Sequence, residues 1–134
     1  SMKKIMFVCT GNSARSQMAE GWAKVLSKGQ WKVCSAGLEP KGVNPYAIKA
    51  MQEIGIDISH QKSKSIDFEL MKNVDVIVTL CDSAKESCPI TPPNIQTFHW
   101  SLPDPAALTG SEAEIIQGFR TIRDEIKEKM KILL

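Results

Sequence analysis

The sequence contains no run of apolar residues near the roughly 20 that a membrane-spanning helix needs, and no signal peptide is visible. It also lacks a block of charge of one sign, because 17 basic side chains are balanced by 15 acidic ones. These absences argue against a membrane or a nucleic acid as the main partner. We therefore expect a soluble, cytoplasmic chain.

Closely spaced cysteine pairs are missing as well. The four cysteines, Cys9, Cys34, Cys81 and Cys88, form no Cys-x-x-Cys pair of the kind that structural zinc sites usually use. In a cytoplasmic chain, four cysteines indicate redox chemistry, catalysis or metal binding rather than a structural disulfide framework. Because zinc is disfavoured by the spacing, we expect no bound metal.

Alternating apolar runs and helical patterns predict one α/β domain over residues 2–134, with a four-stranded parallel sheet flanked by helices. Strands are expected at about residues 5–8, 31–36, 74–78 and 96–100. Inward-facing helical positions are expected at Met18, Trp22, Val25 and Leu26, then Ala47, Met51 and Ile54, and finally Ile115, Phe119, Ile122, Ile126, Met130 and Leu133. A short amphipathic piece is expected at 68–71.

Ligands of parallel sheets lie beyond the carboxyl ends of the strands. Cys9, Cys81 and the turn at 102–105 each follow a predicted strand, so we expect them to meet in one crevice. Cys34 lies within a predicted strand, where inert packing is the better interpretation.

Residues 9–16 follow the first predicted strand and lead into a helix. Such a loop gathers backbone N–H groups around one point, and the helix dipole favours negative charge there. Arg15 adds a fork of donors that suits a tetrahedral anion such as phosphate, sulfate or arsenate. The same positive field favours the thiolate form of Cys9, to which the Ser16 hydroxyl can donate. The residues expected to bind the oxyanion are Thr10, Gly11, Asn12, Ser13, Ala14, Arg15 and Ser16.

Each of these features also has an interpretation without any catalytic role. In that interpretation, Cys9 is a buried cysteine at a strand end that is followed by an ordinary helix cap. Asp104, before Pro105, is otherwise a turn residue, since both residue types favour turns. Beside a loop that holds both Cys9 and Arg15, Asp104 is better interpreted as a general acid for an oxygen that leaves the attacked centre.

Residues 9–22, Cys-Thr-Gly-Asn-Ser-Ala-Arg-Ser-Gln-Met-Ala-Glu-Gly-Trp, resemble the thioredoxin-coupled arsenate reductases, which share the fold of the low-molecular-weight protein tyrosine phosphatases. Further matches are Ser35-Ala36-Gly37, Gly42-Val43-Asn44-Pro45, Ile56-Asp57-Ile58-Ser59, Val78-Thr79-Leu80-Cys81, Cys88-Pro89-Ile90 and Asp104-Pro105-Ala106. The resemblance therefore covers nearly the whole chain. It implies that Cys9 is the nucleophile, Arg15 the oxyanion clamp and Asp104 the acid, with Cys81 and Cys88 as the two resolving thiols.

The resemblance also implies a function and partners. Arsenate would be reduced to arsenite by a relay of three cysteines, phosphate or sulfate would compete for the site, and thioredoxin would reduce the final disulfide. We expect a monomer without a cofactor. Some related reductases hold potassium with residues that match Asn12, Glu20 and Ser35, but a further carboxylate is missing near Lys64, where an ammonium is expected instead.

Two other functions stay open at this point. A low-molecular-weight tyrosine phosphatase would use Cys9, Arg15 and Asp104 alone, but such enzymes typically place aromatic residues after the Asp-Pro pair. Ala106 and Ala107 stand there in this chain and offer little stacking surface. A noncatalytic anion-binding domain is the third possibility, and the intact nucleophile, clamp and acid argue against it.

Overall fold

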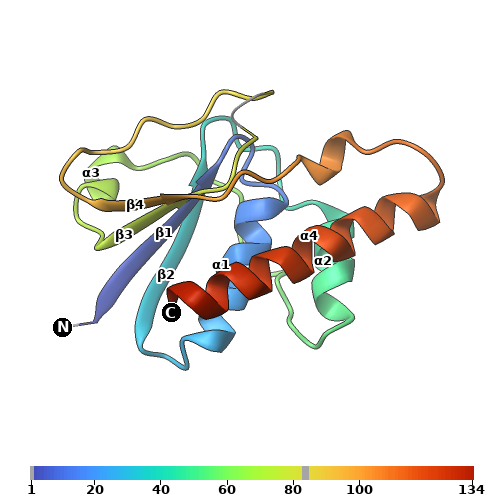
Figure 1. Cartoon of the computed structure of the whole chain (residues 1–134), viewed down its shortest axis with the longest axis horizontal. Coiled ribbons are helices and arrows are strands. Elements are labelled where there is room, and N and C mark those ends of the chain that lie inside the picture. Colours follow the sequence, from blue (N-terminus) through green and yellow to red (C-terminus); the bar gives the residue numbers. More distant parts are fainter. Residues whose placement is uncertain (1, 83–84) are drawn as a thin grey trace.

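Four parallel strands form one sheet in the computed structural model, which describes residues 2–82 and 85–134 (Figure 1). The spatial order is β2-β1-β3-β4. The strands are β1 (Lys3–Cys9), β2 (Trp31–Gly37), β3 (Val76–Thr79) and β4 (Gln96–His99). All three ladders are parallel, so the carboxyl ends of the strands lie along one edge of the sheet. The predicted fold class is confirmed.

Helices cover both faces of this sheet. On one side lie α1 (Arg15–Leu26), α2 (Pro45–Gln52) and α4 (Glu112–Leu133), and on the other lies the short α3 (Phe68–Met71) (Figure 1). A 3-10 helix, η1 (Pro105–Ala107), follows β4. Successive residues of a strand point to opposite faces. Accordingly, Ile5 and Phe7 of β1 pack under α1 and α4, whereas Met6 and Val8 pack toward α3.

Two predicted core positions are wrong. Val25 is 52% exposed because it lies in the last turn of α1 beside Leu26, which packs against the core instead. Ile54 is 38% exposed because α2 ends at Gln52, so Ile54 lies in the turn before Gly55 and the helical spacing no longer applies. The third strand also begins later than predicted, since its pairing with β1 starts at Val76.

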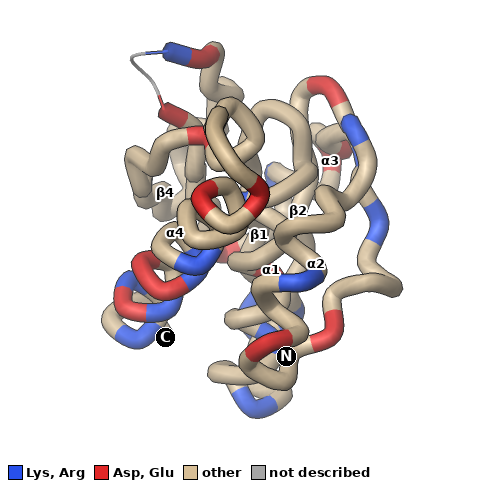
Figure 2. Tube along the Cα trace, turned by 90° about the vertical axis from the view of Figure 1, so that its right-hand side faces the viewer, with Lys and Arg blue, Asp and Glu red and all other residues tan. Residues whose placement is uncertain are grey.

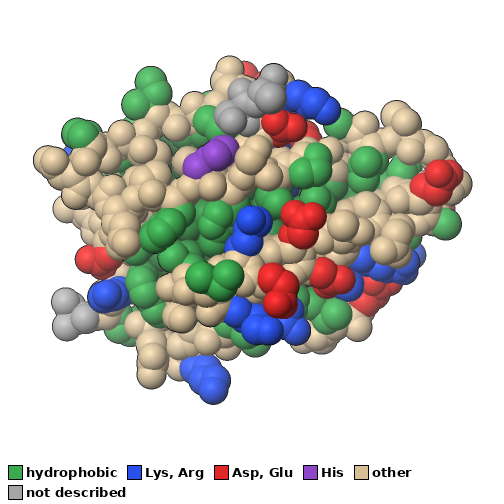
Figure 3. Space-filling view, in the orientation of Figure 1, with side chains coloured by type: hydrophobic (Ala, Val, Ile, Leu, Met, Phe, Trp, Pro, Cys, Tyr) green, Lys and Arg blue, Asp and Glu red, His purple; other side chains and the backbone are tan. Residues whose placement is uncertain are grey.

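Charges of both signs alternate along the surface. On α4, Lys and Arg residues are interspersed with Asp and Glu residues (Figure 2), and charged and apolar side chains lie side by side on the face shown in Figure 3. Ser111 and Glu114 form a capping box at the start of α4.

None of the helices within residues 2–82 and 85–134 has the length and apolarity that crossing a membrane requires.

Candidate active site

The loop between β1 and α1 lies at the carboxyl edge of the sheet, and its backbone carbonyls point away from the pocket. The carbonyls of Thr10 and Gly11 accept hydrogen bonds from the N–H groups of Glu39 and Lys41 at 2.9 and 3.0 Å. A peptide N–H points opposite to its own C=O, so this pattern turns loop N–H groups toward the inside. Asn12 has a positive φ of 44°, and its N–H points at the sulfur of Cys9 at 3.2 Å. The loop therefore forms a nest for an anion.

Polar donors surround the sulfur of Cys9, which is buried. Ser16 Oγ lies 2.9 Å from the sulfur. Asn12 Nδ2 donates to Ser16 Oγ at 2.8 Å, so the Ser16 hydrogen is left free to point at the sulfur. The Asn12 amide is itself fixed, because its Oδ1 accepts from Gln17 Nε2 and from the N–H of Lys64. This chain of hydrogen bonds thus orients the Ser16 hydroxyl and the Asn12 N–H toward the Cys9 sulfur.

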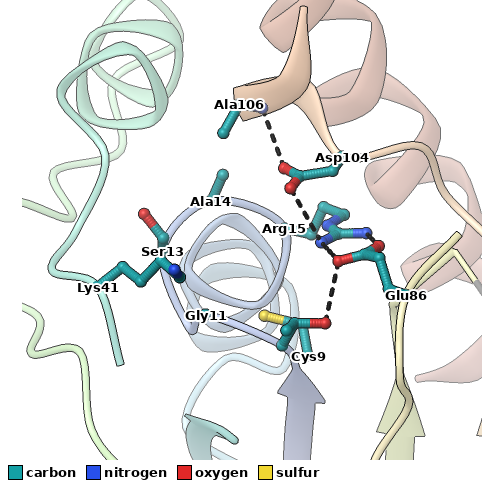
Figure 4. Close-up of a pocket in the computed structure, with 10 residues that line it drawn as sticks. Cys9, Gly11, Ser13, Ala14, Arg15, Lys41, Glu86, Asp104 and Ala106 are labelled. Carbon is teal, nitrogen blue, oxygen red and sulfur yellow. Dashed lines mark hydrogen bonds and ion pairs between the residues drawn. The ribbon is translucent and has the colours of Figure 1, made fainter. Parts of the chain in front are cut away.

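Arg15 lies at the first position of α1 with its guanidinium in the same pocket. Its side chain is 4% exposed, and one of its terminal nitrogens donates to the carbonyl of Leu102 at 3.1 Å. Asp104 Oδ2 lies 3.8 Å from the other terminal nitrogen, while Asp104 Oδ1 accepts from the N–H of Ala106. Figure 4 shows Asp104 above the loop and facing Arg15. Cys9, Arg15 and Asp104 thus line one cavity of about 100 Å³. Cys81, which we expected in the same crevice, is not among the residues that line it, because its side chain is buried behind the sheet edge.

Glu86 also lines this cavity, and the sequence analysis missed it. Both of its carboxylate oxygens pair with the Arg15 guanidinium (Figure 4). This hydrogen bonding with Arg15, aided by the N–H of Asp82 and the hydroxyl of Thr10, lowers the pKa of Glu86 to about 2. The only indication in the sequence was a carboxylate between two cysteines. Lys41 is a second lining residue that the sequence analysis did not select.

Cys81 and Cys88 form a disulfide whose Cα atoms are 5.8 Å apart. Cys81 follows β3 and is buried at the carboxyl edge of the sheet. A ring nitrogen of His99 lies within 4.8 Å of both sulfurs, and His99 Nδ1 lies 2.6 Å from Thr79 Oγ1. The side chains of Cys81, Cys88 and His99 are close enough together to hold a metal ion. Because the sulfurs are bonded to each other, the group offers a metal only the imidazole while the disulfide persists.

The cluster that matches a potassium site does not fit that ion. Glu20 accepts a hydrogen bond from Ser35 at 2.6 Å and pairs with Lys24 at 2.6 Å. The ammonium of Lys64 lies 4.0 Å from Glu20, as expected from the sequence. Asn12 turns its amide nitrogen, a donor, toward Ser35. Donors and ammonium groups thus already occupy the oxygens that a hard cation would need.

Cys34 lies apart from this site. It belongs to β2 and is half-buried, and its sulfur lies 3.7 Å from the carbonyl oxygen of Ile5. Burial raises the pKa of the Cys34 thiol, which disfavours its thiolate. This environment suits the predicted packing role.

Comparison with known proteins places the strand, loop and helix that hold Cys9 and Arg15 in a known family. The family model described as low molecular weight phosphotyrosine protein phosphatase matches residues 4–134. The chain belongs to this family. Within it, the chain is 53% identical over 129 residues to the "Arsenate reductase" of Bacillus subtilis (strain 168), covering 96% of this chain and 93% of the relative.

Solved structures agree with the fold. "An arsenate reductase in the phosphate binding state" superposes with a TM-score of 0.81 at 42% identity, covering 98% of this chain and 96% of the other. A low molecular weight protein tyrosine phosphatase from T. tengcongensis superposes with a TM-score of 0.79, covering 99% of this chain and 97% of the other. At 24% identity, that second likeness shows the common phosphatase fold alone.

Proposed function

We propose that this protein reduces arsenate to arsenite through a relay of Cys9, Cys81 and Cys88. The observation that carries the proposal is the Cys81–Cys88 disulfide beside a loop built to hold an oxyanion over a thiolate. A phosphatase needs one thiol, because water hydrolyses its phosphocysteine. A redox relay instead needs two further thiols that can end as a disulfide, and Cys81 and Cys88 form such a bond here. Support also comes from relatives named arsenate reductase that are 53% and 52% identical in sequence to this chain.

In the first step the Cys9 thiolate bonds to the arsenic of arsenate held by Arg15 and the loop N–H groups. One hydroxyl group on arsenic takes up a proton from Asp104 and leaves as water, so arsenic stays As(V). Nest donors and Arg15 stabilise the negative charge on the remaining oxygens. Each group in this step lines the same cavity.

In the second step the Cys81 thiolate attacks the sulfur of Cys9. The S–As bond breaks with its electron pair left on arsenic, which departs as arsenite, As(III), while the two sulfurs form a disulfide. Cys88 then attacks Cys81, releases the Cys9 thiolate and leaves the Cys81–Cys88 disulfide that the structure holds. Phosphate should bind without being reduced, because its departure as P(III) is far less favourable.

The disulfide must be reduced before another cycle. A dithiol protein of the thioredoxin class has the low reduction potential for this exchange. We propose thioredoxin as that partner and the cytoplasm, where thiols are kept reduced, as the place of action. We also propose that the protein acts as a monomer formed by one domain over residues 2–134, because all the side chains of the relay come from one chain.

Cysteine mapping tests the proposal. Reduced protein is incubated with arsenate, quenched with an alkylating agent and digested for mass spectrometry. We expect an arsenate-dependent Cys81–Cys88 bond, a trapped Cys9–Cys81 bond in Cys88→Ser, and neither bond in Cys9→Ser. Cys34→Ser is the matched control and should behave as the wild type.

A different result would favour a phosphatase. If all thiols stay free in arsenate while an aryl phosphate is hydrolysed briskly, the relay is wrong. Ala106 lines the cavity and gives an aryl ring little to stack on, so we expect at most weak phosphatase activity.

A further inference from the structure

The carboxylate of Glu86 fills the oxyanion clamp in this structure. Arg15 donates through both terminal nitrogens to both Glu86 oxygens, with an Nη2···Oε2 distance of 2.8 Å. Thr10 Oγ1 donates to Oε2 at 2.9 Å, and the N–H of Asp82 donates to Oε1 at 2.8 Å. Each carboxylate oxygen thus accepts two hydrogen bonds, and the side chain is only 14% exposed. Arginine binds phosphate with the same forked geometry, so Glu86 uses the donors that an oxyanion would need.

The local charge leads to the same conclusion. Arg15 faces the carboxylate of Glu86 and, at 3.8 Å, that of Asp104. With Glu86 in place, the single positive charge of the clamp is offset before any oxyanion arrives. A doubly charged oxyanion would then meet the Glu86 carboxylate at the clamp, inside a pocket where charges are only partly screened. Binding an oxyanion therefore requires Glu86 to leave.

The disulfide controls how easily Glu86 can leave. Glu86 lies between Cys81 and Cys88, and their bond closes the segment into a short loop with Cα atoms 5.8 Å apart. A group held on a short tether competes at a high effective concentration, about millimolar or above. Closing the loop also removes conformational freedom in advance, so docking of Glu86 costs less entropy than it would in an open segment. Reduction of the disulfide removes that advantage.

We propose that Glu86 is an internal competitor of the oxyanion substrate that occupies the Arg15 clamp when the Cys81–Cys88 disulfide is formed and releases it when the disulfide is reduced. Glu86 thus orders the cycle, because a new oxyanion binds only once the relay thiols are ready to react. It also replaces the departing product on Arg15, so the guanidinium is not left unpaired. This role rests on the proposed oxyanion site and relay.

Phosphate binding tests the role without any turnover. Inorganic phosphate is titrated calorimetrically into wild type and Glu86→Gln, each prepared with the disulfide formed and with all thiols reduced, the state being verified by mass spectrometry. In the disulfide form we expect Glu86→Gln to bind phosphate about tenfold or more tightly than the wild type. In the reduced form we expect the two proteins to differ by less than about threefold, and the wild type to bind phosphate more tightly than its own disulfide form.

Glu39→Gln is the matched control. The N–H of Glu39 bonds to the carbonyl of Thr10, so this variant removes one exposed carboxylate beside the same loop without touching Arg15. The ratio of its phosphate affinities in the reduced and disulfide forms should equal that of the wild type. Glu86→Ala should reproduce the effect of Glu86→Gln, which excludes an artefact of the new amide.

The outcomes separate two failures. If Glu86→Gln changes phosphate affinity equally in both redox forms, or in neither, the role of Glu86 is wrong while the oxyanion site stands. If no variant binds phosphate in either form, the proposed oxyanion site itself is wrong, and the role of Glu86 is wrong with it.

Discussion

Gly37 lies so close to Asn12 that no side chain fits between them. A Cβ atom on Gly37 would come within 2.7 Å of the backbone nitrogen of Asn12 and 2.9 Å of the carbonyl oxygen of Thr10. Both neighbours are backbone atoms of the anion-binding loop, so they cannot rotate away. The end of β2 thus supports the loop that starts at the end of β1, to which it is paired through Cys9 and Gly37.

We therefore expect Gly37→Ala to disturb the loop. The clash should lower the free energy of unfolding by about 1–3 kcal/mol, as overpacking does, and it should weaken phosphate binding by displacing the Asn12 N–H. Chemical denaturation and calorimetry measure the two effects. Gly11→Ala is a control for stability alone, because its Cβ would meet nothing closer than 3.5 Å. Equal stability of Gly37→Ala and wild type would refute the close contact.

Removing the Ser16 hydroxyl should make Cys9 less reactive. Ser16 lies 2.9 Å from the sulfur, and a hydrogen bond to a charged group contributes about 1.5–3 kcal/mol. Ser16→Ala should slow alkylation of Cys9 by iodoacetamide at neutral pH about tenfold or more. Ser27→Ala removes a hydroxyl at the other end of α1 and should leave the rate unchanged. An unchanged rate in Ser16→Ala would show that the hydroxyl does not stabilise the thiolate.

Lysine should not replace Arg15. Its single ammonium cannot form the forked contact, so Arg15→Lys should weaken phosphate binding to the reduced protein about 10- to 100-fold. Arg120→Lys is the control, because Arg120 makes a similar fork with Glu53 on the exposed surface and such pairs contribute little. Calorimetry compares the two variants. If both bind phosphate as the wild type does, Arg15 is not the clamp.

Asp104→Asn should separate chemistry from binding. Loss of the acid should slow arsenite release about 100- to 10,000-fold. Phosphate binding should be unchanged or tighter, because a negative charge 3.8 Å from Arg15 disappears. Single-turnover arsenite assays and phosphate titration measure the two effects. If the rate of arsenite release and the phosphate affinity fell together, Asp104 would have a structural role in the pocket and not act as the acid.

The Glu86–Arg15 pair should make the disulfide form sensitive to acid. Its hydrogen bond with Arg15 lowers the pKa of Glu86 from an ordinary value of 4.5 to about 2. A carboxyl group whose pKa is lowered by folding stabilises the fold at any pH above its pKa in the unfolded chain. This contribution is lost as the pH falls from about 4.5 toward about 2. The stability difference between wild type and Glu86→Gln should therefore shrink over that interval. A constant difference from pH 6 to pH 2 would contradict the pairing.

Much of the fold could be predicted because local patterns and tertiary packing agree. The run at 5–8 is apolar at every position, and β1 is indeed buried on both faces of the sheet. The short helix predicted at 68–71 is α3, where Asp67 caps the N–H groups of Glu69 and Leu70. Errors occur at helix ends, as at Ile54, where the chain leaves the helix before its periodicity in the sequence ends.

The site was predictable only where chemistry is local. Cys9, Arg15 and Ser16 belong to one loop and one helix turn, so their spacing in the sequence already indicates an oxyanion site. Glu86 is 71 residues from Arg15, and its contact depends on how the segment between two cysteines folds back on the loop. The close approach of Gly37 to Asn12 is likewise a property of paired strand ends, which no local pattern encodes.

A single turnover without added reductant tests the relay most directly. Reduced protein is mixed with excess arsenate, arsenite is quantified, and free thiols are counted before and after. We predict one arsenite per chain and the loss of two thiols, with Cys9 and Cys34 remaining free. Arsenite without thiol loss, or thiol loss without arsenite, would contradict a relay in which the electrons for arsenic come from Cys81 and Cys88.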